Sequence, residues 1–493
     1  MTIHLSIVLF LPLAAGLVGA VLPRGLARWA GLAGALAVLA YVVVMLVDFE
    51  SGGGLQWVTD DEWISELGIR YSLGVDGLNM FLIALTAIAW AACTLVAAFA
   101  DTDRPRLFFF NLALAETAVL GAFMAQDLAL FIVFFDLMLV PFYFLIGGWG
   151  GGDRVRATTK FVIYTLSGSL LMMAAAIALG VLATADGGEL SFSLAELQQR
   201  SVPEGSQHWI VLLFALAFFV KAPLFPLHGW VPDTYRATSI PVLALLSGVL
   251  SKVGVYGFLR IVLPVMPDGA QYWQELFIVL AVFSILYGSI LAFSQDNIRL
   301  VLAYSSIAQL GFIVLGIFAF EEKGTQGALL QMLNHGLVTV PLFLIVGVIA
   351  VRARGSESLA ELGGMAFRAP VLAALFLVTA LATLAMPGSG NFVGEILILF
   401  GTFEDNLVYG LVASAGIVLA AVYMIRLYQG TMHGRTGPPV ESLEIDRVNL
   451  TAVAPLVAVI VALGVYPHFV LDRTERDTGQ AIARTHPEVS VIR

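Results

Sequence analysis

Apolar stretches alternate with short polar segments along nearly the whole chain. A transmembrane helix needs roughly 20 consecutive apolar residues, and windows of that length give about fourteen spans. Their centres lie near Ala14, Val38, Ala87, Ala115, Phe135, Met172, Ala217, Ser251, Ser284, Ser306, Val340, Thr383, Ile417 and Ile460. The pattern predicts an all-α polytopic membrane protein with about fourteen transmembrane helices.

Proline interrupts two of these spans. The seventh contains the run Lys221–Pro226, and the twelfth contains the run Met386–Asn391. Because proline removes a backbone donor and clashes with the preceding turn, both helices should break near the middle of the membrane. The breaks lie five spans apart, which predicts two five-helix repeats, and an odd number of spans makes the second copy inverted. The predicted organisation is residues 1–100 (three helices), 101–265 (first repeat), 266–432 (second repeat) and 433–493 (last helix and tail).

The basic residues indicate an orientation. If the N-terminus lies outside, the inside loops hold 15 of the 25 lysines and arginines, and the outside loops and helix ends hold four. Loops on the inner side of a membrane carry such an excess, so both termini are expected outside. The segment Ile3–Leu22 has no basic stretch before it and is interpreted as a retained first helix, not a cleaved signal peptide.

Composition agrees with a membrane protein and excludes other classes. Charged residues make up 12% of the chain and hydrophobic residues 59%, whereas soluble proteins have about 25% charged residues. The single cysteine, Cys93, rules out a disulfide framework and cysteine-ligated iron–sulfur or zinc sites. The net charge of −10 comes largely from loops such as Asp48–Glu66 and does not suggest nucleic acid. Phosphate-binding loops and soluble nucleotide domains are also missing from the sequence, so any energy source must lie elsewhere.

Several titratable residues lie inside otherwise apolar spans. They are Glu116, Asp136, Lys221, Lys252, His335 and Glu395. A charged group in a bilayer costs several kcal/mol unless it is paired or hydrated, and ion conduction is the usual reason to keep one. The sequence therefore predicts that the protein moves protons through a membrane. The alternative is that static ion pairs fix the helix packing, although such pairs contribute little even to stability.

Lys221 and Asp136 form the first candidate pair. Burial disfavours the charged lysine and a nearby carboxylate favours it, so a lysine between these influences can gain and lose a proton. Lys252 follows Ser247 and Ser251, whose hydroxyls could hold water beside the ammonium. Small residues are also ordinary packing devices at helix contacts, so the serines alone prove nothing.

His335 and Glu395 extend the candidate relay. Histidine changes charge near neutral pH, which suits a stepping stone, but a lone membrane histidine can equally be a hydrogen-bonded structural group. Glu395 follows the second helix break, where water could reach a carboxylate that is otherwise desolvated. Glu116 is a sixth candidate, with contact to a neighbouring subunit as its alternative role.

Six sequence strings carry a family resemblance. They are DGLN (Asp76–Asn79), LVPFYFLIGGWG (Leu139–Gly150), KAPLFPLHGWVPD (Lys221–Asp233), AYSSIAQLGF (Ala303–Phe312), NHG (Asn334–Gly336) and MPGSGNFVGE (Met386–Glu395). In this order they resemble the antiporter-like subunits of proton-pumping NADH–quinone oxidoreductase, respiratory complex I. Glu395 indicates the M-type (chain 4) branch, because the L and N branches and the multi-subunit sodium/proton antiporter proteins are expected to carry lysine there.

The resemblance implies a role for each candidate. Lys221 would be the central proton-binding lysine and Asp136 its modulating carboxylate, while Lys252 and His335 would form the relay that Glu395 connects to the outside. The implied fold is fourteen helices with two inverted five-helix repeats. No cofactor is expected on this chain, whereas flavin, iron–sulfur clusters, NADH and quinone are expected in partner subunits. The implied partners are the antiporter-like chains L and N and, through the complex, its peripheral arm in a bacterial cell membrane.

Two positions depart from the family pattern. Asp136 stands where the family has glutamate, so the ion pair with the central lysine could be looser. Gln309 occupies a position where histidine is common, which would replace a titrating site by a hydrogen-bonding group. Two other functions stay open: a subunit of a sodium/proton antiporter, and a subunit of a related membrane-bound hydrogenase in which buried charges only position helices.

Overall fold

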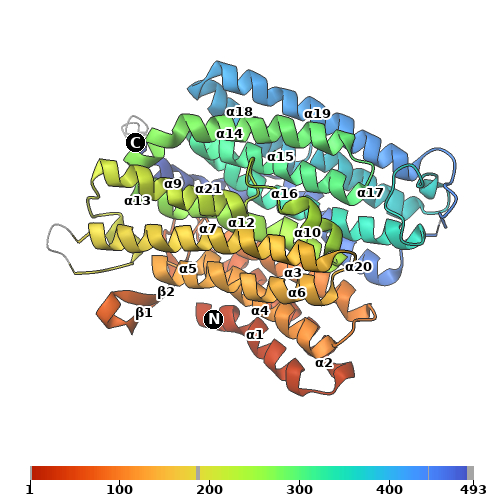
Figure 1. Cartoon of the computed structure of the whole chain (residues 1–493), viewed down its shortest axis with the longest axis horizontal. Helices are drawn as coiled ribbons and strands as arrows, with labels where there is room; N and C mark the ends of the chain where they lie inside the picture. Colours follow the sequence, from red (N-terminus) through yellow and green to blue (C-terminus); the bar gives the residue numbers. More distant parts are fainter. Residues whose placement is uncertain (1–2, 185–188, 442, 486–493) are drawn as a thin grey trace.

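The computed structural model describes residues 3–184, 189–441 and 443–485, and most of its long helices run along the long axis of the molecule (Figure 1). The first half contains α1 (Leu5–Val21), α2 (Arg24–Asp48), β1 (Gln56–Ile64), η1 (Ser65–Leu67), β2 (Ile69–Val75), α3 (Met80–Phe99), α4 (Pro105–Met124), α5 (Leu128–Leu137), α6 (Leu139–Trp149), α7 (Arg154–Leu182), α8 (Leu194–Leu197), α9 (Glu204–Lys221), α10 (Val231–Ala237), α11 (Ile240–Leu245), η2 (Leu246–Leu250), α12 (Ser251–Gly257), η3 (Phe258–Val262) and α13 (Leu263–Val265). The second half contains α14 (Pro267–Ser294), α15 (Ile298–Phe318), α16 (Glu322–Arg352), η4 (Met365–Phe367), α17 (Pro370–Thr383), α18 (Gly390–Asp405), α19 (Leu407–Met432), α20 (Arg447–Val465) and α21 (His468–Ile482).

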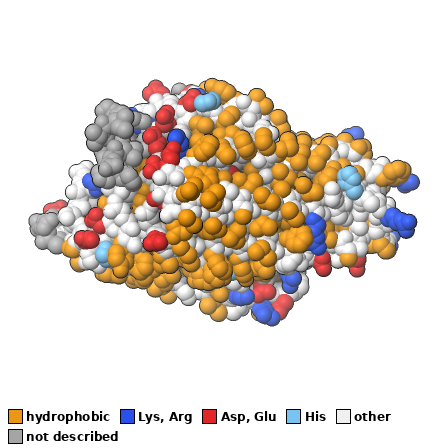
Figure 2. All heavy atoms as spheres, turned by 90° about the horizontal axis from the view of Figure 1, so that it is seen from above, with side chains coloured by type: hydrophobic (Ala, Val, Ile, Leu, Met, Phe, Trp, Pro, Cys, Tyr) orange, Lys and Arg blue, Asp and Glu red, His pale blue; other side chains and the backbone are white. Residues whose placement is uncertain are grey.

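The described residues include 11 helical segments long and apolar enough to cross a membrane. The apolar helices α1 and α17 are shorter. Figure 2 shows a broad field of hydrophobic side chains across one face, with acidic groups mostly at one end and basic groups mostly at the other. This distribution fits a helical bundle surrounded by lipid hydrocarbon, and each predicted span centre falls within one of its helices.

Both predicted helix breaks are present. Helix α9 ends at Lys221, and the chain makes turns until α10 begins at Val231. Helix α17 ends at Thr383, and α18 begins at Gly390 after a second turn region. The Ser389 hydroxyl accepts a hydrogen bond from the Phe392 N–H and so caps α18. The C-terminal end of α9 and the N-terminal end of α18 therefore lie inside the bundle. The terminal backbone N–H and C=O groups of a helix have no partner within it, whereas a continuous helix would pair them.

The all-α expectation missed a β-hairpin. Strands β1 and β2 pair antiparallel at one end of the bundle, where the sequence suggested only an acidic loop (Figure 1). The fifth span is also divided, since α5 ends at Leu137 and α6 starts at Leu139. The ring of Pro141 explains this kink, because it clashes with the carbonyl four residues earlier, at Leu137. Asp136 therefore lies at a kink of its span.

Helix α16 lies at the centre of the molecule. It packs against α15, α18, α11, η2, α17, α20 and α21, and most of its residues are buried. Helix α16 contacts α11 and η2, which directly precede the Lys252 segment, and also α18, which carries Glu395, so it lies between the two halves of the chain.

Candidate functional site

Lys221 is the last residue of α9 and is almost fully buried. Its ammonium donates a hydrogen bond to the Phe135 carbonyl at 3.2 Å and lies 4.3 Å from the centroid of the Phe135 ring. Asp136 is close enough to interact electrostatically, but within the described residues the two groups form no direct ion pair. Oδ1 of Asp136 is buried without a hydrogen-bond partner in the same part of the chain. Lys221 and Asp136 are therefore neighbours in this structure without a direct ion pair.

Lys252 lies on α12, between the π-helical segments η2 and η3. It is fully buried and donates to the Ser247 carbonyl at 2.9 Å and the Ser251 hydroxyl at 3.3 Å. The Ser247 hydroxyl pairs with that of Ser306, while its carbonyl accepts from Lys252. π-helical turns often occur at functional sites, and here they flank a buried cation.

His335 extends from α16 into the same region. It is buried and interacts electrostatically with Lys252. Its Nδ1 has no hydrogen-bond partner within the described part of the chain. A buried imidazole nitrogen without a partner is costly, so this position suits a group that exchanges a proton or binds water.

Glu395 lies in the second turn of α18, directly after the break. Its Oε1 accepts hydrogen bonds from the side-chain amides of Gln309 at 2.9 Å and Gln331 at 3.3 Å. The two amides also bond to each other, with Gln331 donating to Gln309 at 2.8 Å. The other oxygen, Oε2, is buried and has no described partner. Gln309 thus acts as the hydrogen-bonding group expected from the sequence, and Gln331 is a partner that the sequence did not reveal.

Gln331 connects the two ends of this arrangement. It precedes His335 by one helical turn on α16, so both side chains lie on the same face of that helix. Gln331 therefore links Glu395, to which it donates a hydrogen bond, with the face of α16 that carries His335. His335 in turn interacts electrostatically with Lys252. Gln331 lies four residues before His335 in an otherwise apolar helix, and this spacing could have identified it from the sequence.

Glu116 and His228 are further buried groups. Glu116 lies in the middle of α4, which packs against α5 and α12, and its Oε1 has no described hydrogen-bond partner. His228 lies in the turns after Lys221, stacked against Phe225, and its Nδ1 is likewise unpaired in the described residues. Its position in the string KAPLFPLHGWVPD could have marked it as a candidate.

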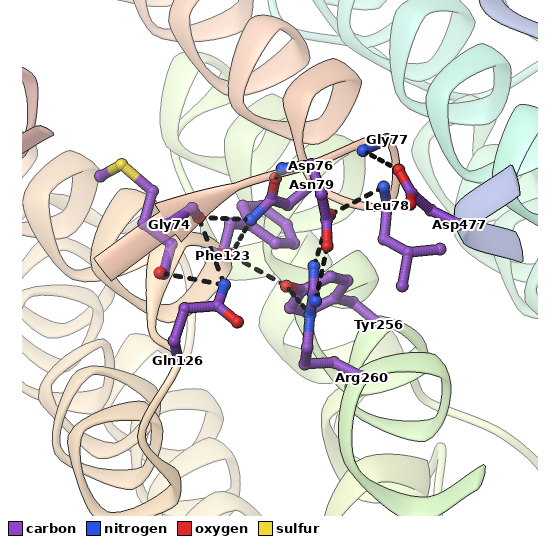
Figure 3. A network of polar contacts seen from close by, with 11 residues as sticks. Gly74, Asp76, Gly77, Leu78, Asn79, Phe123, Gln126, Tyr256, Arg260 and Asp477 are labelled. Carbon is purple, nitrogen blue, oxygen red and sulfur yellow. Dashed lines mark hydrogen bonds and ion pairs between the residues drawn. The ribbon is translucent and has the colours of Figure 1, made fainter. Parts of the chain in front are cut away.

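Arg260, one of the four cations that the sequence assigned to the outside loops and helix ends, lies at a helix end and is buried and ion-paired there. Figure 3 shows its guanidinium bound to both oxygens of Asp76, at 2.7 and 2.6 Å, and to the Tyr256 hydroxyl at 2.8 Å. Asp477 of α21 accepts the Gly77 N–H at 2.6 Å beside this pair. The network joins three distant segments: the start of α3, the end of the Lys252 helix and the C-terminal helix.

These contacts leave several buried polar atoms without a hydrogen-bond partner among the described residues, on side chains whose chemistry allows proton exchange. Amine, imidazole and carboxyl groups all do so, and they occupy neighbouring central helices. The described residues contain no group of three or more histidine, cysteine or acidic side chains placed to hold a metal ion. Within the described part of the chain no hydrogen bond joins Lys221, Lys252 and Glu395 directly, so transfer between them would need water or side-chain movement.

Comparison with known proteins gives a consistent result. Residues 125–420 match the family model described as NADH:quinone oxidoreductase/Mrp antiporter, TM. The chain is 39% identical to a Mycobacterium tuberculosis protein named NADH-quinone oxidoreductase subunit M, over 95% of this chain and 92% of the relative.

Two solved structures have similar folds. One chain of respiratory complex I from Thermus thermophilus with bound NADH superposes with a TM-score of 0.90 at 29% identity, covering 98% of this chain and 100% of that one. A chain of the Mrp complex from a Dietzia species superposes with a TM-score of 0.83 at 23% identity, covering 99% of each chain. At that identity the second likeness concerns the fold alone.

Proposed function

The chain belongs to the NADH:quinone oxidoreductase/Mrp antiporter family of membrane subunits, and from this we propose that it is the M-type, proton-translocating subunit of a respiratory NADH–quinone oxidoreductase. The single observation that carries the proposal is the set of buried titratable groups inside the helical bundle. Lys221, Lys252, His335 and Glu395 all lie on helices at the centre of the bundle. A packing role alone would not require so many buried atoms without partners.

The proposed relay begins at the α5 kink. When Asp136 is ionised and close, Lys221 holds its proton; when the pair opens, as in this structure, the ammonium loses much of that support and can release the proton. Lys252 would accept it as a neutral amine, and His335 would exchange it through its unpaired Nδ1. Glu395, reached past Gln331, would then pass the proton outward.

The wider arrangement is part of the same proposal. We place about fourteen spans in the membrane, with two inverted five-helix repeats and both termini outside. Redox chemistry would take place in partner subunits that carry flavin, iron–sulfur clusters, NADH and quinone, with the energy reaching this chain through the neighbouring L and N chains. The single cysteine in the sequence supports this division, because cysteine thiolates are the usual ligands of such clusters.

Replacement of Lys221 by alanine tests the relay. In membrane vesicles that contain the assembled complex, Lys221→Ala should reduce the protons pumped per NADH oxidised at least several-fold, because the central proton carrier is lost. Lys323→Ala is the matched control, since Lys323 forms an exposed ion pair with Glu404, and it should pump normally. Unchanged pumping by an assembled Lys221→Ala complex would contradict the proposal.

The matching family model also describes the Mrp antiporter, which keeps the antiporter as the alternative function. Purification of the tagged chain from its host in mild detergent separates the two. Co-purification with flavin and iron–sulfur subunits and with NADH–quinone reductase activity is the expected result. Co-purification with membrane chains only, together with sodium-dependent proton exchange, would favour the antiporter.

A further inference from the structure

A basic pocket opens where the α1–α2 turn meets the start of α4. Its volume is about 490 Å³, and its lining consists of Arg24, Asp103, Arg104, Pro105, Arg106 and Leu107. Three arginines and one aspartate thus line the pocket, which gives it an excess of positive charge. It is remote from the relay described above.

The backbone holds two of these arginines in place. Arg106 donates through Nε to the Leu22 carbonyl at 2.6 Å. Arg104 donates to the Gly148 carbonyl at 3.0 Å and lies 5.0 Å from the centroid of the Trp149 ring. Because each guanidinium has five N–H donors, both retain free donors after these contacts. The side chains are therefore preorganised without being neutralised.

Four other arginines at this end of the bundle are neutralised within the chain, whereas Arg435 and Arg447, for example, form no ion pair among the described residues. Ion pairs join Arg299 to Glu357, Arg352 to Asp446, Arg354 to Glu441 and Arg426 to Asp296. Within the described residues, none of the three pocket arginines has such a partner, even though Asp103 lies in the wall. Their charge is therefore available to an external anion, and guanidinium groups bind phosphate oxygens in a bidentate fashion.

The surroundings of the pocket are apolar. Leu107 lines it and is 53% exposed, Val21 in the adjoining turn is 81% exposed, and Leu26 is 49% exposed. Nearby, Trp29 and Phe99 make an edge-to-face contact at 5.3 Å, and both are also exposed. Exposed apolar side chains beside a basic pocket suit an amphiphile that has an anionic head and hydrocarbon chains.

We propose that this pocket binds the phosphodiester headgroup of an anionic phospholipid, with Arg24, Arg104 and Arg106 as its ligands. The acyl chains would lie against Leu107 and Val21. A free phosphate would use the same donors but would gain nothing from the apolar rim.

The test is native mass spectrometry of the full chain in detergent micelles, titrated with phosphatidylglycerol or phosphatidylcholine. Wild type should form a saturable one-to-one adduct with phosphatidylglycerol. The variant Arg24→Gln/Arg104→Gln/Arg106→Gln should weaken this adduct at least tenfold, while phosphatidylcholine binding stays weak in both.

The matched control Arg354→Gln/Arg435→Gln/Arg447→Gln removes the same charge from exposed positions at the same end and should bind within twofold of wild type. Equal weakening in both triple variants would overturn the proposal, because the attraction would then be nonspecific.

Two further measurements exclude other ligands. Inorganic phosphate at the same concentration should not displace the lipid; full displacement would make the pocket a site for free phosphate.

Lipid extracted from the purified complex should contain less phosphatidylglycerol when the pocket variant replaces wild type. If the isolated chains differ but the complexes do not, the pocket is covered by a neighbouring subunit, and the lipid assignment is wrong. An unchanged thermal unfolding temperature of the pocket variant shows that any loss of binding is not due to misfolding.

Discussion

At the scale of single residues, two side-chain amides determine the surroundings of Glu395. Gln309 and Gln331 both direct their N–H groups at Oε1, which leaves Oε2 without a described partner. An amide cannot carry a proton at neutral pH, but it can orient a carboxyl group that does. In the proposed relay, Oε2 would therefore be the oxygen that exchanges the proton.

Replacement of Gln331 tests this role. Gln331→Leu keeps the approximate size of the side chain but removes one donor to Glu395 and the link to Gln309. A hydrogen bond to a charged group contributes about 1.5–3 kcal/mol, so we expect proton pumping by the assembled complex to fall roughly tenfold or more. The measurement is the ratio of pumped protons to oxidised NADH.

Gln326→Leu provides the control for the same substitution on the same helix. Gln326 donates to the Leu471 carbonyl, away from the relay, and its replacement should leave the pumping ratio close to wild type. Gln331→His should restore part of the activity, because an imidazole can donate from this position. Normal pumping by Gln331→Leu would show that the amide only fills space.

At the scale of elements, the Asp76–Arg260 pair connects helices that are far apart in sequence. Arg260 lies at the end of the helix that carries Lys252, and Asp76 precedes α3. A buried ion pair contributes little to net stability compared with apolar residues, but the loss of one partner is costly because the other charge stays buried. Its main effect is therefore to fix where these elements meet.

Arg260→Met should destabilise the chain by about 3–5 kcal/mol, because Asp76 is left as a buried unpaired carboxylate. Thermal unfolding of the purified chain can be followed with a thiol-reactive dye, since the only cysteine, Cys93, is buried until the chain unfolds. Arg70→Met is the control, because the exposed Arg70–Asp60 pair is worth less than about 1 kcal/mol. Equal shifts of the unfolding temperature in the two variants would contradict the assignment.

The N-cap of α5 gives a prediction about pH. Burial raises the pKa of the Asp127 carboxyl from 3.8 to about 6, against the opposing effect of hydrogen bonds from the Leu130 and Arg70 N–H groups. The folded chain therefore binds a proton more tightly than the unfolded chain. This contribution to stability is complete below about pH 4 and is lost as pH rises through about 6.

Asp127→Asn keeps an oxygen that can cap α5 but removes the charge. Relative to wild type, the variant should therefore gain up to about 3 kcal/mol of stability between pH 4 and pH 7. The measurement is again thermal unfolding reported by Cys93, at both pH values. A difference that does not change with pH would show that Asp127 has an ordinary pKa.

At the scale of the whole molecule, orientation in the membrane follows from charge. The two faces of the bundle differ in their basic residues, and crossing helices alternate in direction, so fixing one loop fixes all the others. The exposed loop with Ser201 should lie outside, and the exposed loop with Arg435 should lie inside.

Cysteine labelling of intact cells tests this orientation. In a Cys93→Ala background, Ser201→Cys should react with a membrane-impermeant maleimide, and Arg435→Cys should react only after the cells are permeabilised. The reversed labelling pattern would invert the topology and with it the proposed direction of proton movement. Arg493 and the terminal residues themselves lie outside the described residues, so internal loops are the better reporters.

The sequence by itself determined the membrane class, the span centres, the two proline breaks and the identity of the buried titratable residues. Each of these follows from local chemistry: apolar length, the missing proline N–H and the cost of a charge in hydrocarbon. Only the tertiary structure decided which partners these residues have. The contact of Lys221 with the Phe135 carbonyl, the amide of Gln331 beside Glu395 and the Arg260–Asp76 pair all join segments through space. The period of an apolar helix shows which residues share a face, but it does not show which other helix that face meets.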